Sequence, residues 1–265
     1  MTDLPYYHVD AFAERPFTGN QAAVMPLTHW LDDAVLQAIG EENNFAETAF
    51  YVPDKTGAAD YELRWFTPEV EIRLCGHATL ASGHIVLSEN PALDRVTFRT
   101  RKAGILEVRR EGDGYAVALP AIPTKPVNNP EMMQAMGGNP LSMRSNPDGY
   151  NMFVYATAAE ILALKPDMKT LAKLGDDSFT ATAPGQDTDI VSRVFVPGAG
   201  VDEDSVTGSA HAVLTPYWTA ELGRDNFTAY QASARGGYLG CRLDGERVWL
   251  SGDCFTVVRG MFSLG

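Results

Sequence analysis

The 265-residue sequence is 45% hydrophobic and 21% charged, which is the composition of a globular protein with enough chain for a large core. Its formal net charge of −13 would repel nucleic-acid phosphates and anionic lipid, and no basic residues are gathered into a patch that offsets it. No apolar run is long enough to span a membrane, and the first residues lack the pattern of a secretory signal. We therefore expect a cytoplasmic protein without nucleic-acid or membrane partners.

The first half of the chain alternates short strand-like segments with one helical pattern. Residues rich in β-branched and aromatic side chains predict strands over 7–12, 47–52, 61–66, 95–100, 105–110 and 115–120. Apolar residues at helical spacing predict a helix over 30–42, with Thr28 as a candidate cap. The basic stretch 99–110 alternates at strand period, which favours solvated strand ends around a turn over a nucleic-acid site.

A proline-rich, weakly patterned stretch, Ile122–Pro130, predicts the crossing between two halves. We therefore divide the chain into an N-terminal lobe, residues 1–121, and a C-terminal lobe, residues 122–265, whose last strand is able to cross back to the first lobe. The second half is similar in kind, with strands predicted over 151–158 and 189–197, a short helix over 168–175, and a helix that begins within 205–211.

The two halves also match in detail. Arg64–Pro68 and Arg193–Pro197 share the pattern Arg-x-Phe-x-Pro at an offset of 129, and Leu74–Leu87 matches Val206–Thr219 at an offset of 132. Each half therefore has a strand, an acidic loop and a helix start rich in small residues, in the same order. This pattern predicts an internal duplication with two similar lobes.

The helix starts at Gly76 and Gly208 are candidate anion sites. The first N–H groups of a helix lack intrahelical partners, the helix dipole adds partial positive charge, and glycine removes the side chain that would block approach. An acidic protein can thus bind a small carboxylate substrate through backbone amides.

Three side chains are candidates for moving protons, and each has a structural alternative. Glu47 lies in an apolar strand-like run, where partial desolvation would favour its protonated form, as a general acid requires; it could equally face solvent. His77 follows Gly76 in the first helical turn and could act near neutral pH or cap the helix. Asp204 precedes the second helix and could simply cap it. Cys75 is reactive only if the helix dipole lowers its pKa, and is otherwise a small buried apolar residue, while Thr207 occupies the matching position of the second helix start. His84, seven residues after His77, gives poor spacing for a metal pair, so we expect no metal.

Five segments in order resemble the signature segments of the phenazine-biosynthesis isomerase family, called PhzF-like. The resemblance covers nearly the whole chain and rests on Asp10–Val24, Asn43–Phe50, Leu63–Ala81, Gly200–His211 and Pro216–Gly223. It implies an α+β, diaminopimelate-epimerase-like fold, in which two similar lobes each wrap a curved, barrel-like sheet around a central helix and the active site lies in the cleft between them.

The resemblance also implies a role for each candidate residue. Glu47 maps onto a single glutamate that takes a proton from one carbon and returns it to another, in a cofactor-independent isomerisation of a small unsaturated, cyclic carboxylic acid. His77 and Asp204 map onto partners that bind the polar groups of the substrate and steer the proton, and Asn20 is a candidate for lining the cleft. The substrate carboxylate maps onto the helix starts with Gly76, Gly208 and Ser209. Related epimerases use a cysteine at both helix starts; here these positions are Cys75 and Thr207, and a threonine hydroxyl is too weak a base.

Three points are left open by the sequence. Family members usually have proline where this chain has Ser205, so the Asp204 loop loses a φ restraint unless the Ser205 hydroxyl caps the helix. The alternatives to an isomerase are an amino-acid epimerase or racemase that uses Cys75, and a catalytically silent carboxylate-binding protein. A homodimer is expected from the resemblance and from how common twofold homodimers are.

Overall fold

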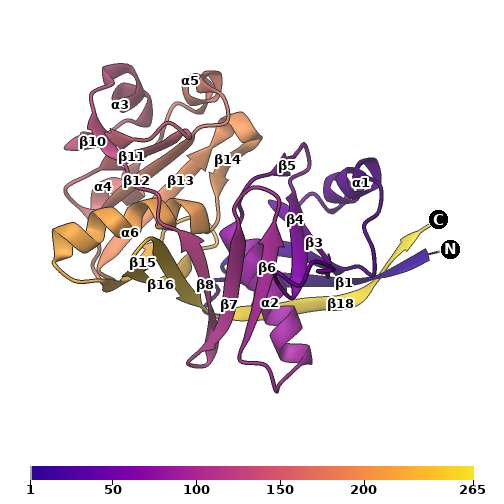
Figure 1. The fold of residues 1–265 in the computed structure, drawn as a ribbon. Coiled ribbons are helices and arrows are strands. Elements are labelled where there is room, and N and C mark those ends of the chain that lie inside the picture. Colours follow the sequence, from indigo (N-terminus) through magenta and orange to yellow (C-terminus); the bar gives the residue numbers. More distant parts are fainter. Residues whose placement is uncertain (1) are drawn as a thin grey trace. The chain divides into compact units, whose positions relative to one another are not determined.

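The computed structural model describes residues 2–265 and divides the chain into two compact units. The first unit combines the residues up to Leu119 with Ser251–Gly265, and the second is Pro120–Leu250. The sequence-based division had left residues 251–265 with the C-terminal lobe. They belong to the first unit because the last strand pairs with the first strand from Thr2↔Leu264 to Ala11↔Cys254, which also brings the two ends of the chain side by side (Figure 1). No helix within residues 2–265 has the length and apolar character of a membrane span.

The first unit is a curved sheet wrapped around one helix. Its pairings give the order β18, β1, β2, β3, β4, β6, β7, β8, with β2–β3 and β4–β6 parallel. The helix α2 contacts strands near both ends of this order, including β18 and β7, so the sheet curves around it. The elements are β1 (Thr2–Ala11), β2 (Asn20–Pro26), α1 (Asp33–Asn43), β3 (Glu47–Pro53), β4 (Tyr61–Phe66), β5 (Glu71–Ile72), α2 (Gly76–Glu89), β6 (Arg95–Thr100), β7 (Ile105–Glu111), β8 (Gly114–Pro120) and β18 (Cys254–Leu264).

The second unit repeats this topology. The order β9, β10, β11, β12, β13, β15, β16 again has two parallel pairs, β11–β12 and β13–β15, and α6 contacts β11 and β16. The elements are β9 (Lys125–Val127), α3 (Pro130–Met136), β10 (Ser142–Ser145), β11 (Tyr150–Val154), α4 (Ala158–Ala163), α5 (Met168–Leu171), η1 (Ala172–Leu174), β12 (Ser178–Pro184), β13 (Ile190–Val196), η2 (Pro197–Ala199), β14 (Val201–Asp204), α6 (Gly208–Leu222), β15 (Asn226–Gln231), β16 (Gly237–Asp244) and β17 (Arg247–Gly252).

Each unit contains the same partly buried ion pair at the same place. In β4 the Arg64 guanidinium donates to Glu71 through Nε and Nη2, both at 2.8 Å, and stacks on Phe66. In β13 Arg193 donates to Glu203 at 2.7 and 2.9 Å and stacks on Phe195. The acidic loops of the repeat therefore hold the short strands β5 and β14 against the long strands, a structural role for Glu71 and Glu203.

The central helices α2 and α6 are buried around most of their circumference, which explains their small residues.

Pro216 lies inside α6 and lacks the N–H that would bond the carbonyl of Ala212. The backbone N–H of Ile122 donates to that carbonyl at 3.1 Å instead. The connection that the sequence marked as a crossing thus satisfies the carbonyl that Pro216 leaves without a helical partner.

Two local predictions need correction. The helix predicted over 30–42 is α1 and begins at Asp33, and its N-cap residue is Asp32 rather than Thr28. Trp30 precedes the helix because its indole N–H donates to Glu62 at 2.6 Å. The strand β2 was not predicted, since Ala22 and Ala23 give it no β-branched signal.

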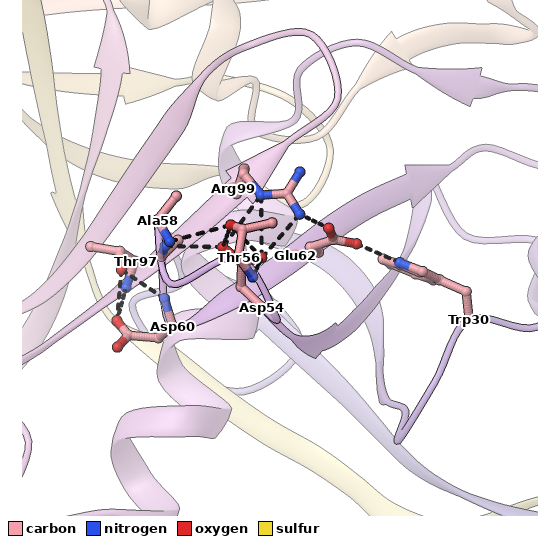
Figure 2. A network of polar contacts seen from close by, with 9 residues as sticks. Trp30, Asp54, Thr56, Ala58, Asp60, Glu62, Thr97 and Arg99 are labelled. Atoms are coloured by element: carbon pink, nitrogen blue, oxygen red, sulfur yellow. Dashed lines mark hydrogen bonds and ion pairs between the residues drawn. The ribbon is translucent and has the colours of Figure 1, made fainter.

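A polar network orders the turn after β3 (Figure 2). The Asp54 carboxylate accepts hydrogen bonds from the Thr56 backbone and hydroxyl, the Ala59 backbone and Arg99. Arg99 also pairs with Glu62, which accepts from Trp30. Burial opposes ionisation of Asp54, but the hydrogen bonds from Thr56 and Arg99 outweigh it and hold the pKa of Asp54 well below its ordinary 3.8.

Asp54→Asn is expected to lower stability near neutral pH and to matter less in acid. A carboxyl with a lowered folded pKa contributes stability above its unfolded pKa and loses that contribution as the pH falls through the folded value. Urea-unfolding midpoints should therefore show a constant gap between wild type and variant above about pH 4 that narrows below it. Asp113→Asn, at an exposed turn of the same unit, removes the same charge and serves as control. A gap equally wide at pH 3 and pH 7 would contradict this account.

Candidate active site

Four of the predicted side chains meet in the first unit. His77 lies between three groups: Nε2 is 3.1 Å from Oε2 of Glu47, and Nδ1 is 3.2 Å from Nδ2 of Asn20 and 3.5 Å from Sγ of Cys75. The ring is 3% exposed and the Glu47 side chain 16% exposed. Oε2 of Glu47 is shielded from solvent, and it has no partner of hydrogen-bond geometry within the described residues. A carboxylate oxygen beside an imidazole, without a competing donor, is available for proton transfer.

Local structure explains how Glu47 reaches this position. The helix α1 ends at Asn44, which adopts left-handed geometry (φ 50°) and donates its N–H to Gly40 at 3.2 Å. The chain then reverses into β3, whose first residue is Glu47. Strand alternation places Glu47 on the same face as Ala49, which pairs with Trp65 of β4.

The start of α2 supplies the other groups. Cys75 is the extended N-cap residue, Gly76 and His77 begin the helix, and the Thr79 hydroxyl donates to the Cys75 carbonyl at 2.5 Å. Asn20 is the first residue of β2 and is 2% exposed. Glycine at 76 leaves the first turn without a side chain where the polar groups converge.

Electrostatics favours a charged His77–Glu47 pair and a neutral Cys75. Burial raises the pKa of the Cys75 thiol to about 11, and the Glu47 carboxylate adds to this effect. Burial opposes protonation of His77, but Cys75 and Glu47 raise the pKa of its imidazole well above its ordinary 6.5. Because Cys75 is an uncharged thiol at pH 7, the Glu47 carboxylate is the anion that keeps His77 protonated.

Glu47, Cys75 and His77 also place three potential metal-ligand atoms within 4.8 Å of one another. The imidazole lies between the other two groups, with one ring nitrogen toward each. A single ion bound to one ring nitrogen would therefore have to displace existing contacts, and Cys75 would have to ionise despite its raised pKa. The donor set fits acid/base chemistry better than a metal centre. His84 is held by Thr256 at 2.9 Å and belongs to a different set of contacts.

The remaining predicted residues form a second cluster, within the second unit. The Thr207 hydroxyl donates to Oδ2 of Asp204 at 2.5 Å, and Gly208 and Ser209 follow as the first residues of α6. Thr207 is the N-cap residue, yet its side chain does not cap the helix. Its hydroxyl binds Asp204 instead, so it leaves the first-turn N–H groups of α6 to other acceptors.

Ser205 restrains the Asp204 loop in a way that proline could not. Its backbone N–H donates to Oδ1 of Asp204 at 2.8 Å, and its carbonyl accepts from Ser233 at 2.7 Å. Proline would remove that N–H. The predicted loss of restraint is therefore offset by two hydrogen bonds, and neither of them involves the Ser205 hydroxyl.

Gln231 was missed by sequence reasoning although it holds this loop. Its side chain accepts from the Thr207 N–H at 2.8 Å and donates to the Asp204 carbonyl at 2.8 Å and to the Thr207 hydroxyl oxygen at 3.1 Å. It is fully buried. Strand alternation could have found it, because Gln231 shares the buried face of β15 with Phe227 and Ala229.

His211 and its repeat-equivalent, Thr79, are different side chains that both bond the carbonyl of the N-cap residue. Nδ1 of His211 bonds the Thr207 carbonyl at 2.8 Å, as the Thr79 hydroxyl does for Cys75. Burial lowers the pKa of His211 to about 4, so it is neutral at pH 7 and serves as a buried structural group.

Known proteins show the same architecture over the whole chain. The chain matches the family described as phenazine biosynthesis-like protein (PhzC-PhzF) over residues 9–260. An uncharacterized isomerase of Pseudomonas aeruginosa is 45% identical over 264 residues, which cover 99% of this chain and 100% of the relative. The crystal structure of a PhzF-family protein from Enterococcus faecalis matches with a TM-score of 0.90 at 39% identity, covering 99% and 100%. A hydroxyproline epimerase from Agrobacterium vitis shares the fold, with a TM-score of 0.64 at 12% identity, covering 98% and 92%.

Two lobes, each a curved sheet around a central helix, define a diaminopimelate-epimerase-like α+β protein, and the predicted fold class is confirmed. Within that class, this chain belongs to the phenazine biosynthesis-like PhzF family. It is an isomerase by class, since full-length relatives are named isomerases.

Proposed function

We propose that this isomerase moves a proton between two carbons of a small unsaturated carboxylic acid, with Glu47 as the only proton carrier and without a cofactor. The observation that supports it most is the Glu47 carboxylate, 16% exposed and with Oε2 3.1 Å from Nε2 of the buried His77, whose pKa this carboxylate raises.

The proposed reaction balances without an oxidant or reductant. The Glu47 carboxylate takes a proton from an sp³ carbon next to the double bond, and the C–H electron pair moves into a new double bond. The π electron pair of the original double bond moves to its far carbon, where it forms the new C–H bond with the proton that the Glu47 carboxylic acid returns. The Asn20 amide contacts Nδ1 of His77 and would hold the ring with Nε2 toward Glu47. Beside a doubly protonated ring, the amide must present its carbonyl oxygen to Nδ1, because both ring nitrogens then donate.

The two-base alternative has less support. A racemase that uses Cys75 would need a thiolate, and burial raises the pKa of this thiol to about 11. At the repeat-equivalent position Thr207 donates its hydroxyl proton to Asp204. Neither group is a suitable base at neutral pH.

The substrate carboxylate is proposed to bind backbone N–H groups at helix starts. The first turn of α2 begins with Gly76, and that of α6 with Gly208 and Ser209; neither has a side-chain cap from its N-cap residue. Asp204, fixed by Ser205 and Thr207, would accept a hydrogen bond from a polar group of the substrate. We also propose that a small carboxylate is the binding partner and that the protein forms a homodimer.

Proton exchange in heavy water tests the reaction class directly. The protein is incubated with a panel of cyclic and acyclic unsaturated carboxylic acids, and deuterium uptake is followed by NMR. Incorporation at a new carbon, with a shifted double bond, is the expected result. Incorporation only at an original stereocentre would identify an epimerase. Saturable binding without incorporation would identify a binding protein, and either of these outcomes would overturn the proposal.

A further inference from the structure

The Gln231 amide lies fully buried between β15 and the loop that leads into α6. Its Oε1 accepts from the Thr207 N–H at 2.8 Å, and its Nε2 donates to the Asp204 carbonyl at 2.8 Å. These two backbone partners fix the orientation of the amide, because a flipped amide would set donor against donor and acceptor against acceptor. The second Nε2 proton is then directed at the Thr207 hydroxyl oxygen, 3.1 Å away.

This orientation decides where the Thr207 hydroxyl proton points. The hydroxyl has one proton, and because its oxygen accepts from Gln231, the proton is left to bond Oδ2 of Asp204 at 2.5 Å. The other carboxylate oxygen, Oδ1, accepts from the Ser205 N–H at 2.8 Å. Gln231 thus holds Asp204 in two ways, directly at the backbone carbonyl and through Thr207 at the carboxylate.

The first unit shows that the fold does not require this arrangement. The strand registers and the helix starts place Ile72, Cys75 and Thr100 at the positions of Asp204, Thr207 and Gln231. Thr100 bonds within its own turn instead, where its hydroxyl donates to the Gly104 carbonyl at 2.8 Å. The polar cluster is therefore particular to the second unit and serves something other than the shared scaffold.

The cluster also diverts Thr207 from the usual role of its position. An N-cap threonine stabilises a helix by accepting from an N–H of the first turn, and Thr207 is the N-cap residue of α6 without making that bond. A buried amide such as Gln231 is likewise tolerated only while its hydrogen bonds are satisfied. Both features are explained if the cluster fixes the Asp204 carboxylate rather than the helix.

We infer that Gln231 is a positioning residue of the proposed reaction: by directing the Thr207 hydroxyl, it fixes the direction in which the Asp204 carboxylate faces the substrate. The inference rests on the proposed function, in which Asp204 accepts a hydrogen bond from a polar group of the substrate. Because Gln231 is fully buried, it acts on the substrate only through the Asp204 loop.

A double-mutant cycle tests this route. Gln231→Met removes the amide at similar volume, and Thr207→Val replaces the hydroxyl, which does not cap α6, by a methyl group. On the acid that the heavy-water experiment identifies, each change is expected to raise KM by about tenfold, the scale of one hydrogen bond to a charged group. The double variant should stay well below the roughly hundredfold increase of two independent effects, because both changes break the same route.

Two variants separate this role from a purely structural one. The Thr182 hydroxyl is also fully buried in the second unit, but it bonds the Val191 carbonyl and the Trp218 indole. Thr182→Val should therefore lower the urea midpoint and leave KM unchanged. Thr207→Ser keeps the hydroxyl and should retain the wild-type KM within about threefold.

Hydrogen exchange of the Ser205 amide gives a readout that needs no substrate. This N–H donates to Asp204, so it is expected to exchange at least about tenfold faster in Gln231→Met and in Thr207→Val than in wild type or Thr182→Val. If wild type turned over no acid, the proposed function would fail, while the exchange rates would still show whether Gln231 fixes Asp204.

Three results would overturn the inference. The first is an unchanged Ser205 exchange rate in Gln231→Met. The second is a pair of KM effects that multiply in the double variant. The third is a folded Thr207→Val protein with the wild-type KM, which decides the question even if Gln231→Met does not fold.

Discussion

Glu47→Gln is expected to lower turnover by about 10²-fold or more while the protein stays folded. Glutamine keeps the shape of the side chain and its place beside His77, but it cannot take up and return a proton. The rate of deuterium incorporation, measured on whichever acid the heavy-water experiment identifies, is the direct readout. An unchanged thermal midpoint within a few degrees shows that the change acts on chemistry.

Two further variants separate proton transfer from the charge of Glu47. Glu47→Asp keeps the carboxylate but withdraws it by one methylene, so an intermediate rate is expected. Glu42→Gln removes the same charge from an exposed position five residues earlier, on α1, and should leave the rate unchanged. A folded Glu47→Gln protein that keeps more than about a tenth of the wild-type rate would remove Glu47 from the mechanism.

The duplication could be predicted because each half contains the same local sequence motifs. Arg-x-Phe-x-Pro and the small-residue helix starts occur twice at nearly constant offset, and the structure places them on β4 and β13 and on α2 and α6. Strand patterning likewise identified most strands of the first unit, but in the second unit the predicted strands match only β11 and β13. What the repeat did not reveal is that Glu71 and Glu203 bind the strand arginines. Which acid of a loop folds back on a strand depends on the register of a short edge strand, and the composition of the loop does not fix that register.

The candidate site was predictable in its members but not in its contacts. The pattern around Glu47 shows that it shares a strand face with Ala49, but only the curvature of the sheet around α2 decides that this face meets His77. The resemblance to the family named both residues as parts of the site, but their contact is seen only in the structure. Gln231 was missed because no strand was predicted over β15, so its place on the buried face went unseen. Its hydrogen bonds to a loop 24 to 27 residues earlier could not be predicted in any case, because no local pattern records contacts over that distance.

Gly83→Ala is expected to destabilise the protein by about 3 kcal/mol, although alanine is the better helix former. Gly83 lies in the middle of α2, where the helix packs on β7. A Cβ atom there would lie 2.3, 2.5 and 2.8 Å from Cγ1, Cβ and Cγ2 of the buried Val108. The gain in helix propensity is about 1 kcal/mol, so the steric term decides the sign. Urea unfolding measures the difference.

A double-mutant cycle with Val108 shows whether this contact is the cause. Val108→Gly removes all three clashing atoms and is itself destabilising, but combined with Gly83→Ala it should give a favourable coupling of about 1–3 kcal/mol. Val108→Ala removes only the two Cγ atoms and should couple more weakly. Gly260→Ala, where an added Cβ meets nothing within 4 Å, is the matched control and should change stability by less than about 0.5 kcal/mol. Additive effects of Gly83→Ala and Val108→Gly would contradict this account, because two side chains that clash cannot contribute independently. Another contact would then fix the distance between α2 and β7.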